Sequence, residues 1–308
     1  MMRENTLLYS VSMPSLPFYI VDVFAVRRYS GNPLAVVANA GDLATETMQA
    51  IAREINFSET TFILKDSPED GGYPVRIFTP AKELPFAGHP TLGTAYIIQQ
   101  ELIQSSIERV NLNLQVGQIP VRWETDSSGE EYLWMQQNPA EFFEICAPEV
   151  VAPMLGLSAD DIDDRFPIQV VSTGIPFTIV PLKTHRALKQ CRVNLSLYNE
   201  FIEQTEGKEI FVFCPETNYP ENDFSARMFA DYLGVPEDPA TGSANGCFAA
   251  YLVKHNYLNS KTLDARVEQG YEIDRPSLLR LRAQDNNGEI APQVGGRVIS
   301  ISKGEIFV

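Results

Sequence analysis

Two segments of the chain, half its length apart, repeat one another. Residues 83–89 read Glu-Leu-Pro-Phe-Ala-Gly-His, and residues 237–243 read Glu-Asp-Pro-Ala-Thr-Gly-Ser. Glutamate, proline and glycine recur, each 154 positions after its counterpart (237 − 83, 239 − 85 and 242 − 88). Each segment ends on a glycine and a polar residue at the start of a helical pattern. The repeat predicts two similar halves facing each other across a cleft, with two helix N-termini, which attract anions, directed into it.

Two further echoes lie upstream of these segments. Arg-Ile-Phe at 76–78 corresponds to Arg-Met-Phe at 227–229, and Gly-Asn-Pro-Leu-Ala-Val-Val at 31–37 corresponds to Gly-Ile-Pro-Phe-Thr-Ile-Val at 174–180. Their separations of 151 (227 − 76) and 143 (174 − 31) residues drift from 154, as loop insertions would make them. The echoes therefore favour two complete copies of one fold pattern.

The chain has 308 residues, a length that favours two domains over one large core. The polar, turn-like stretch 126–130 is the expected boundary between them. The predicted N-terminal half covers 1–130, with 1–16 as a loose lead-in, and the C-terminal half covers 131–308. The last strand, at about 296–308, is a candidate to return to the first half.

Composition restricts the partners and the compartment. With 44% hydrophobic and 21% charged residues, the chain reads as an ordinary globular protein. The net charge of −16 opposes binding to nucleic acid or to an anionic membrane, although it leaves room for a small anionic substrate in a locally positive pocket. Four scattered cysteines, the lack of a signal-like stretch and the lack of a long apolar run predict a reduced, cytoplasmic protein. A homodimer is the general expectation.

Short strands dominate the expected secondary structure. Apolar and β-branched runs predict strands at 18–26, 34–37, 57–64, 73–78, 111–116, 119–124, 131–136, 168–171, 178–182, 210–214, 224–229, 278–282 and 297–301. Helical spacing predicts a helix over 44–55 that ends at Asn56. Pro90 suits the first turn of a helix that runs to about residue 100, which puts His89 at or next to its N-cap, and another helix starts at Ser243. Many short strands with one prominent helix in each half indicate an α+β fold rather than a doubly wound one.

Glu59 is the first candidate for chemistry. It lies just after a predicted helix, between Phe57 and Phe62, with no positive charge until Lys65. Apolar neighbours raise the pKa of a carboxyl group by desolvation, which suits a group that takes a proton and returns it. The plain alternative is a half-exposed glutamate in a strand.

Three polar residues near the two glycines are candidates for binding. Asp238 precedes a proline and lies five residues before Ser243, where it could accept hydrogen bonds from a ligand or simply favour the helix terminus. His89 could offer its ring and its amide to an anion, or be an ordinary cap histidine. Ser243 could do the same with its hydroxyl, or serve as a plain N-cap.

Several kinds of chemistry find no support in the sequence. The three histidines are scattered and give no metal-ligand spacing, and no glycine-rich nucleotide motif is present, so no metal and no cofactor are expected. The segment 242–246 (Gly-Ser-Ala-Asn-Gly) departs from the Gly-x-Ser-x-Gly nucleophile elbow because its serine comes second. Cys247 falls on the apolar face of its helix, where core packing is the expected role.

Five motifs together resemble those of the PhzF (phenazine biosynthesis-like) family. They are Val-Asp-Val-Phe at 21–24, Gly-Asn-Pro-Leu-Ala-Val at 31–36, Phe-Ser-Glu-Thr-Thr-Phe at 57–62, Phe-Ala-Gly-His-Pro-Thr-Leu-Gly at 86–93 and Glu-Asp-Pro-Ala-Thr-Gly-Ser-Ala-Asn-Gly at 237–246. Their order and spacing fit over roughly residues 18–308, and the last two are quite specific.

The resemblance implies a diaminopimelate epimerase-like fold, in which two pseudo-symmetric domains each wrap a mostly antiparallel sheet around a central helix. It implies a cofactor-independent isomerase that resembles trans-2,3-dihydro-3-hydroxyanthranilate isomerase, with a glutamate, here Glu59, that moves a proton between ring carbons. Carried over by motif, His89, Asp238 and Ser243 would hold a small carboxylate substrate. Gly88 and Gly242 would offer backbone amides, and Asn32 is a weaker carry-over.

Two rival functions stay open beside the isomerase. Related epimerases and proline racemases use two cysteines, and here those places hold Ala87 and Thr241, neither of which can replace a thiolate. An amino-acid racemase or epimerase would therefore need Asp238 as its second proton donor. A non-catalytic binding protein that kept the anion cleft is the other alternative. It would be favoured over an enzyme if Glu59 did not face His89, Asp238 and Ser243 across a closed pocket.

Overall fold

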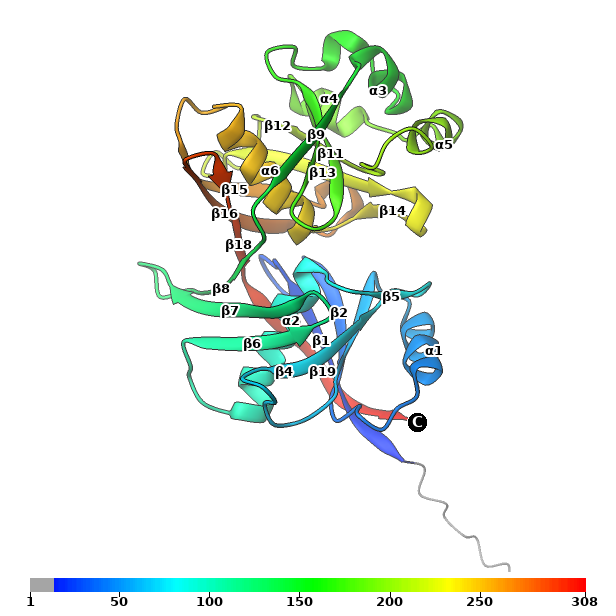
Figure 1. Ribbon diagram of the computed structural model, residues 1–308, viewed down its shortest axis with the longest axis vertical. Helices are drawn as coiled ribbons and strands as arrows, with labels where there is room; N and C mark the ends of the chain where they lie inside the picture. Colours follow the sequence, from blue (N-terminus) through cyan, green and yellow to red (C-terminus); the bar gives the residue numbers. More distant parts are fainter. Residues whose placement is uncertain (1–13) are drawn as a thin grey trace, which may run out of the picture.

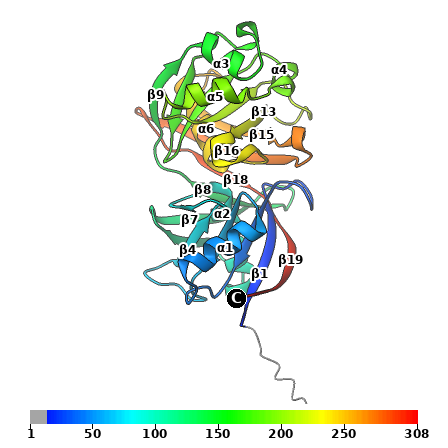
Figure 2. The same ribbon diagram turned by 90° about the vertical axis from the view of Figure 1, so that its right-hand side faces the viewer.

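The computed structural model describes residues 14–308, which form two bodies stacked along the long axis (Figures 1 and 2). The first half contains β1 (Ser15–Val23), β2 (Asn32–Val37), α1 (Thr45–Ile55), β3 (Glu59–Ile63), β4 (Tyr73–Phe78), β5 (Glu83–Leu84), α2 (Gly88–Ile97), a π-helix (Ile98–Ile103), β6 (Arg109–Leu114) and β7 (Gly117–Thr125). After it come β8 (Glu131–Gln136), β9 (Glu141–Cys146), α3 (Pro148–Met154), β10 (Ile168–Ser172), β11 (Pro176–Pro181), α4 (His185–Gln190), α5 (Leu195–Ile202), β12 (Glu209–Cys214), β13 (Phe224–Ala230), β14 (Val235–Asp238) and α6 (Gly242–Lys254). The chain closes with β15 (Thr262–Gln269), β16 (Ser277–Asn286), β17 (Glu289–Ile290), β18 (Gln293–Gly296) and β19 (Val298–Phe307); short 3₁₀ turns cover Ala159–Asp161, Asp231–Leu233 and Tyr271–Ile273.

The two halves share one strand-pairing order. In the first, β1 and β2 are antiparallel, β2 and β3 parallel, β3 and β4 antiparallel, β4 and β6 parallel, and β6 and β7 antiparallel. The second half repeats this series with β10, β11, β12, β13, β15 and β16. The hairpins β4–β5 and β13–β14 also correspond. The sequence echoes therefore mark equivalent places in two copies of one mixed, mainly antiparallel topology.

Two links join the halves. β8 pairs with β7 on one side and with β18 on the other, so it bridges the two sheets. β19 leaves the second half and pairs with β1 along the whole of that strand, which Figure 1 shows as the red strand running beside the blue one. The boundary near residue 130 stays a prediction; the turn over 126–130 leads directly into β8.

Each half is built around one buried helix. Every residue of α2 except Tyr96 is buried, and so is every residue of α6 except Lys254. Helices that are apolar all round belong inside a core. Phe248 of α6 packs its ring against Phe213 and Phe224 of the surrounding sheet, at centroid distances of 4.4 and 5.2 Å. The α+β class and the central helices are confirmed.

The first helix ends as its sequence indicates. Met48, Ile51 and Ala52 form the buried face of α1, while Asn56 adopts a left-handed conformation with φ of 57° and donates its amide to the Ala52 carbonyl. Asparagine tolerates this conformation better than most residues. The chain therefore turns at Asn56 and enters β3 three residues later, at Glu59.

Several expectations about the elements were wrong. β1 starts at Ser15 because residues 15 and 16 pair with the distant β19, so they are not part of a loose lead-in; residues 1–13 lie outside the described part. The strand expected over 18–26 ends at Val23, since Phe24 takes a positive φ of 58°. The second half holds α3, α4 and α5 beside its central helix, and these have only seven, six and eight residues, too short for clear periodicity.

Candidate active site

The two repeated glycines meet at the junction of the halves. A Cβ atom added to Gly88 would lie 2.8 Å from the Ser243 amide nitrogen and 3.0 Å from the Gly242 Cα. Real Cβ atoms essentially never show the first of these distances, so the two helix starts approach this closely because Gly88 carries no Cβ. α2 and α6 begin at these glycines, with Ala87 and Thr241 as their N-caps. His89 and Ser243 are therefore the second residues of their helices, not the caps.

Replacing Gly88 by alanine is expected to destabilise the protein by about 1–3 kcal/mol, the usual cost of overpacking. Urea unfolding measures this change. Gly304→Ala in β19 is the matched control, because an added Cβ there meets no atom within 4 Å; its effect should stay within about 0.5 kcal/mol. Equal, small effects of both substitutions would show that the helix starts do not depend on their close approach.

A cavity of about 580 Å³ lies where the two helix starts meet. It is lined from the first half by Phe57, Ser58, Glu59, Lys82, Leu84, Ala87, Gly88 and His89 among others, and from the second by Phe177, Glu209, Met228, Tyr232, Asp238, Thr241, Gly242 and Ser243 among others. Six of the seven predicted site residues thus line one cavity. Asn32 is the exception.

Glu59 opens β3 and faces this cavity. Its side chain is only 15% exposed, and its Oε2 atom is buried without a hydrogen-bond partner. Burial, and secondly the negative charge of Asp238, raise the pKa of Glu59 to about 8. A carboxyl group in this state exchanges its proton near neutral pH, which is what a group that alternates between acid and base needs.

His89 lies beside Glu59 and is neutral. Its Nε2 atom is 3.4 Å from Glu59 Oε2 and is likewise buried without a hydrogen-bond partner. Burial lowers the pKa of His89 to about 3, although a hydrogen bond with the Pro33 backbone acts in the opposite direction. Because proline has no backbone N–H and Nε2 has no partner, Nδ1 is the ring nitrogen left to donate to Pro33, which makes Nε2 an acceptor. Both atoms lack a partner while Glu59 is ionised, which is costly unless a ligand contacts them, whereas a protonated Glu59 would donate to Nε2. The two atoms therefore point to a site that binds a ligand or exchanges a proton.

Asp238 is held by three side chains. Its Oδ1 accepts from Asn32 Nδ2 at 2.9 Å and from the Ser58 hydroxyl at 3.2 Å, and its Oδ2 accepts from the Thr241 hydroxyl. Desolvation raises the pKa of Asp238, and these hydrogen bonds lower it. Asn32, expected to bind substrate, also donates to the Ala240 carbonyl at 2.9 Å, so it lies behind Asp238 and fixes its carboxyl group.

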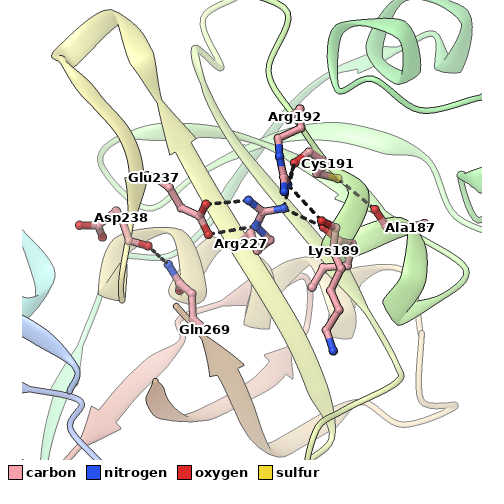
Figure 3. A network of polar contacts seen from close by, with 9 residues as sticks. Ala187, Lys189, Cys191, Arg192, Arg227, Glu237, Asp238 and Gln269 are labelled. Atoms are coloured by element: carbon pink, nitrogen blue, oxygen red, sulfur yellow. Dashed lines mark hydrogen bonds and ion pairs between the residues drawn. The ribbon is translucent and has the colours of Figure 1, made fainter. Parts of the chain in front are cut away.

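A buried ion pair fixes the strand that carries Asp238 (Figure 3). Arg227 donates to both carboxyl oxygens of Glu237, at 2.9 and 2.7 Å, and to the carbonyls of Leu188 and Cys191. Gln269 donates to the Asp238 carbonyl at 2.9 Å. The equivalent pair in the first half is Arg76 with Glu83, the other echo of the sequence repeat. The arginine and glutamate of the sequence repeat thus form the same ion pair in each half.

Sequence reasoning missed several residues of the cavity and its supports. Ser58 and Thr241 hold Asp238, and Gln137 donates to the Gly242 carbonyl at 2.8 Å while accepting from the Thr173 hydroxyl. Glu209 and Tyr232, both from the second half of the chain, also line the cavity. Ser58 could have been suspected from its place beside Glu59, and Thr241 from its place three residues after Asp238. Gln137, Glu209 and Tyr232 come from distant segments and carry no local signal.

The places of the epimerase cysteines hold no thiol. Ala87 and Thr241 both line the cavity, and the Thr241 hydroxyl donates a hydrogen bond to Asp238. Cys247 is buried in α6, and burial raises the pKa of its thiol to about 12. Across residues 14–308, no cluster of three or more histidine, cysteine, aspartate or glutamate side chains could hold a metal ion. In the same range, no helix is both long and apolar enough to span a bilayer.

Comparison with known proteins agrees with the sequence motifs and the fold. The family profile described as phenazine biosynthesis-like protein matches residues 21–304. An uncharacterized isomerase of Mesorhizobium japonicum is 32% identical over 305 residues, which cover 96% of this chain and 100% of that protein. Trans-2,3-dihydro-3-hydroxyanthranilate isomerase of Pseudomonas aeruginosa is 32% identical over 292 residues, covering 94% and 99%.

Solved structures extend the comparison to the fold. A PhzF-family protein of Bacillus anthracis superposes with a TM-score of 0.88 at 26% identity, covering 96% of this chain and 100% of that one. A hydroxyproline epimerase of Agrobacterium vitis, at 10% identity and a TM-score of 0.61, covers 96% and 93% and shows a shared fold alone. The chain therefore belongs to the PhzF (phenazine biosynthesis-like) family, has a diaminopimelate epimerase-like fold and is an isomerase.

Proposed function

We propose that this isomerase moves a proton between carbons of a small carboxylate-bearing substrate, with Glu59 as the single acid and base. The observation that supports this most is the pairing of two unpartnered buried atoms, Glu59 Oε2 and His89 Nε2, in the cavity between the helix starts. The substrate of the Pseudomonas aeruginosa relative, trans-2,3-dihydro-3-hydroxyanthranilate, is the compound with which we would test the proposal.

The reaction needs only groups that this chain supplies. The Glu59 carboxylate takes a proton from a carbon next to a conjugated system, so a C–H bond breaks and an O–H bond forms. The electron pair enters the conjugated system. Glu59 then returns the proton to another carbon of that system, and atoms and electrons balance.

The helix starts and the neighbouring side chains support these steps. The amides at Gly88 and Gly242 begin two helices, whose positive dipole ends favour the substrate carboxylate and the charge that develops during the reaction. His89 Nε2 can accept from the protonated Glu59 and orient its O–H. Asp238 and Ser243 are placed to hold a polar substituent of the substrate.

Turnover of trans-2,3-dihydro-3-hydroxyanthranilate in heavy water, followed by proton NMR, tests this function. We expect one ring C–H signal to disappear, the double bonds to move, and deuterium to enter the carbon that receives the proton. Neither isomerisation nor exchange of a C–H position would contradict the proposal for this substrate.

The pH dependence of the reaction follows from the raised pKa of Glu59. Because the base form starts the reaction and the pKa lies at about 8, most of the free enzyme carries the unreactive acid at pH 7. We expect kcat/KM to rise about tenfold per pH unit below that pKa and to level off above it. A profile that is flat between pH 6 and 9 would contradict the assignment.

An epimerase of amino-acid-like substrates is a second candidate, because Asp238 lines the same cavity and desolvation raises its pKa as well. It is the less favoured one, since the Asp238 oxygens already accept three hydrogen bonds from protein side chains. Rapid exchange at a stereocentre that is lost in Asp238→Asn would favour the epimerase.

A further inference from the structure

A second buried carboxyl group lies in the cavity outside the machinery described above. Glu209, the first residue of β12, is 6% exposed and lines the cavity together with Tyr232, whose hydroxyl donates to Glu209 Oε1 at 2.7 Å. The cavity lining also includes the apolar residues Phe177, Met228, Ala230, Leu233 and Val235 and one cationic residue, Lys82. Among the described residues, no lysine, arginine or histidine forms an ion pair with Glu209.

Strand register places Glu209 on the same sheet face as Asp238. Phe211, Met228 and Asp238 lie in one row across β12, β13 and β14. Glu209 lies two residues before Phe211, in the next row on that face, level with Ala230. Strand rise and strand spacing then put the Cα atoms of Glu209 and Asp238 about 12 Å apart. The two carboxyl groups therefore mark two separated points along one wall.

A purely structural role explains Glu209 poorly. A glutamine would accept the Tyr232 hydrogen bond equally well and would avoid the cost of burying an ionisable group. Burial raises the pKa of Glu209, while Tyr232 and the charges of Lys82 and Lys208 favour its ionised form. The desolvation penalty of a buried carboxylate is best compensated when a ligand cation or a strong hydrogen-bond donor contacts it.

We propose that the Glu209 carboxylate, which accepts a hydrogen bond from Tyr232, is a second recognition point that binds an ammonium or similarly strong hydrogen-bond donor on the substrate, at the end away from its acid group. The inference rests on the proposed function, because that function places the acid group at the helix starts. The cavity volume of about 580 Å³ lies within the range of roughly 300–1,000 Å³ that is usual for small-molecule sites. Asp238 is the weaker candidate for the ammonium, because three of the roughly four acceptor positions of its carboxylate are already used by protein side chains.

Two matched ligands test the inference by isothermal titration calorimetry. The probes are 4-(aminomethyl)benzoate, with an acid and an ammonium at opposite ends of a ring, and 4-methylbenzoate, which lacks the ammonium. The wild type should bind the aminomethyl compound about 10–100-fold more tightly, as expected for a charge-assisted hydrogen bond. In Glu209→Gln this preference should fall to about one, with the affinity for 4-methylbenzoate unchanged.

Two controls separate recognition from structural support. Tyr232→Phe removes the hydroxyl but keeps the carboxylate, so the preference should persist even if the melting temperature falls. Asp238→Asn addresses the rival contact: because Asp238 lines the same cavity, its replacement can shift the affinity for each probe, but the ratio between the two affinities should stay as in the wild type. Equal affinities of the wild type for both probes, or a preference that survives in Glu209→Gln and is lost in Asp238→Asn, would overturn the inference while the proposed function stands. If the wild type bound neither probe, the helix starts at Gly88 and Gly242 would not bind a carboxylate. That result would contradict both the proposed function and the present inference.

Discussion

Replacing Glu59 by glutamine is expected to lower kcat on trans-2,3-dihydro-3-hydroxyanthranilate by about 10³–10⁴-fold, toward the upper end of what general acid–base groups contribute. Glutamine has nearly the same size and can still contact His89, but its amide cannot take a proton from carbon. KM should change little, because the amides at Gly88 and Gly242 remain. Steady-state kinetics on the purified variant measure both constants.

Glu54→Gln is the matched control for this experiment. Glu54 is an exposed glutamate of α1, five residues before Glu59, so its replacement makes the same carboxyl-to-amide change without touching the cavity. It should leave kcat within about twofold, as expected for a surface substitution away from the site. Undiminished activity of Glu59→Gln would remove Glu59 as the proton carrier.

Loss of the Arg227 guanidinium is expected to destabilise the protein by about 3–5 kcal/mol, because it leaves Glu237 buried without its partner. The side chains of Arg227 and Glu237 are 4% and 9% exposed. Arg76 and Glu83 form the equivalent pair, with exposures of 25% and 22%, so water can compensate the loss there. Arg76→Met should therefore cost about 1 kcal/mol or less, as partly exposed ion pairs usually do.

The two variants control each other, because their pairs occupy equivalent strands. Each arginine also lies over the aromatic ring two residues further on, Phe229 or Phe78, at 4.9 and 5.0 Å. Urea unfolding of Arg227→Met and Arg76→Met compares them directly. Equal losses of unfolding free energy in the two variants would show that burial does not decide how much the Arg227–Glu237 ion pair stabilises the protein.

Six of the predicted site residues line one cavity, and they could be singled out from the sequence because their signals are local. Glycine before a helical pattern and a proline in its first turn mark a helix start, and the repeat of 154 residues shows that there are two. The apolar neighbours of Glu59 indicate desolvation without any knowledge of the fold. These features lie within a few residues of one another, so they can be read without coordinates.

The rest of the site depends on contacts between distant segments. Asn32 meets Asp238 across 206 positions, and Gln137 meets Gly242 across 105. Glu209 enters the cavity only because β12 lies beside β13 in the sheet. The short helices α3–α5 are fixed by packing rather than by periodicity. The homodimer and the cytoplasmic location stay predictions.

The pKa of the Glu59 carboxyl group tests the central claim most directly. Carbon NMR of protein labelled at the glutamate δ-carbon, with Glu59→Gln used to assign the signal, follows its titration. The account predicts a titration near pH 8, far above the usual value of 4.5, because burial and Asp238 disfavour the charged form. The folded state then binds this proton more tightly than the unfolded state, so the stabilisation it provides is complete below about pH 4.5 and is lost as the pH rises through 8. A titration near 4.5 would mean that Glu59 is hydrated and ionised, and the proposed proton transfer would lose its basis.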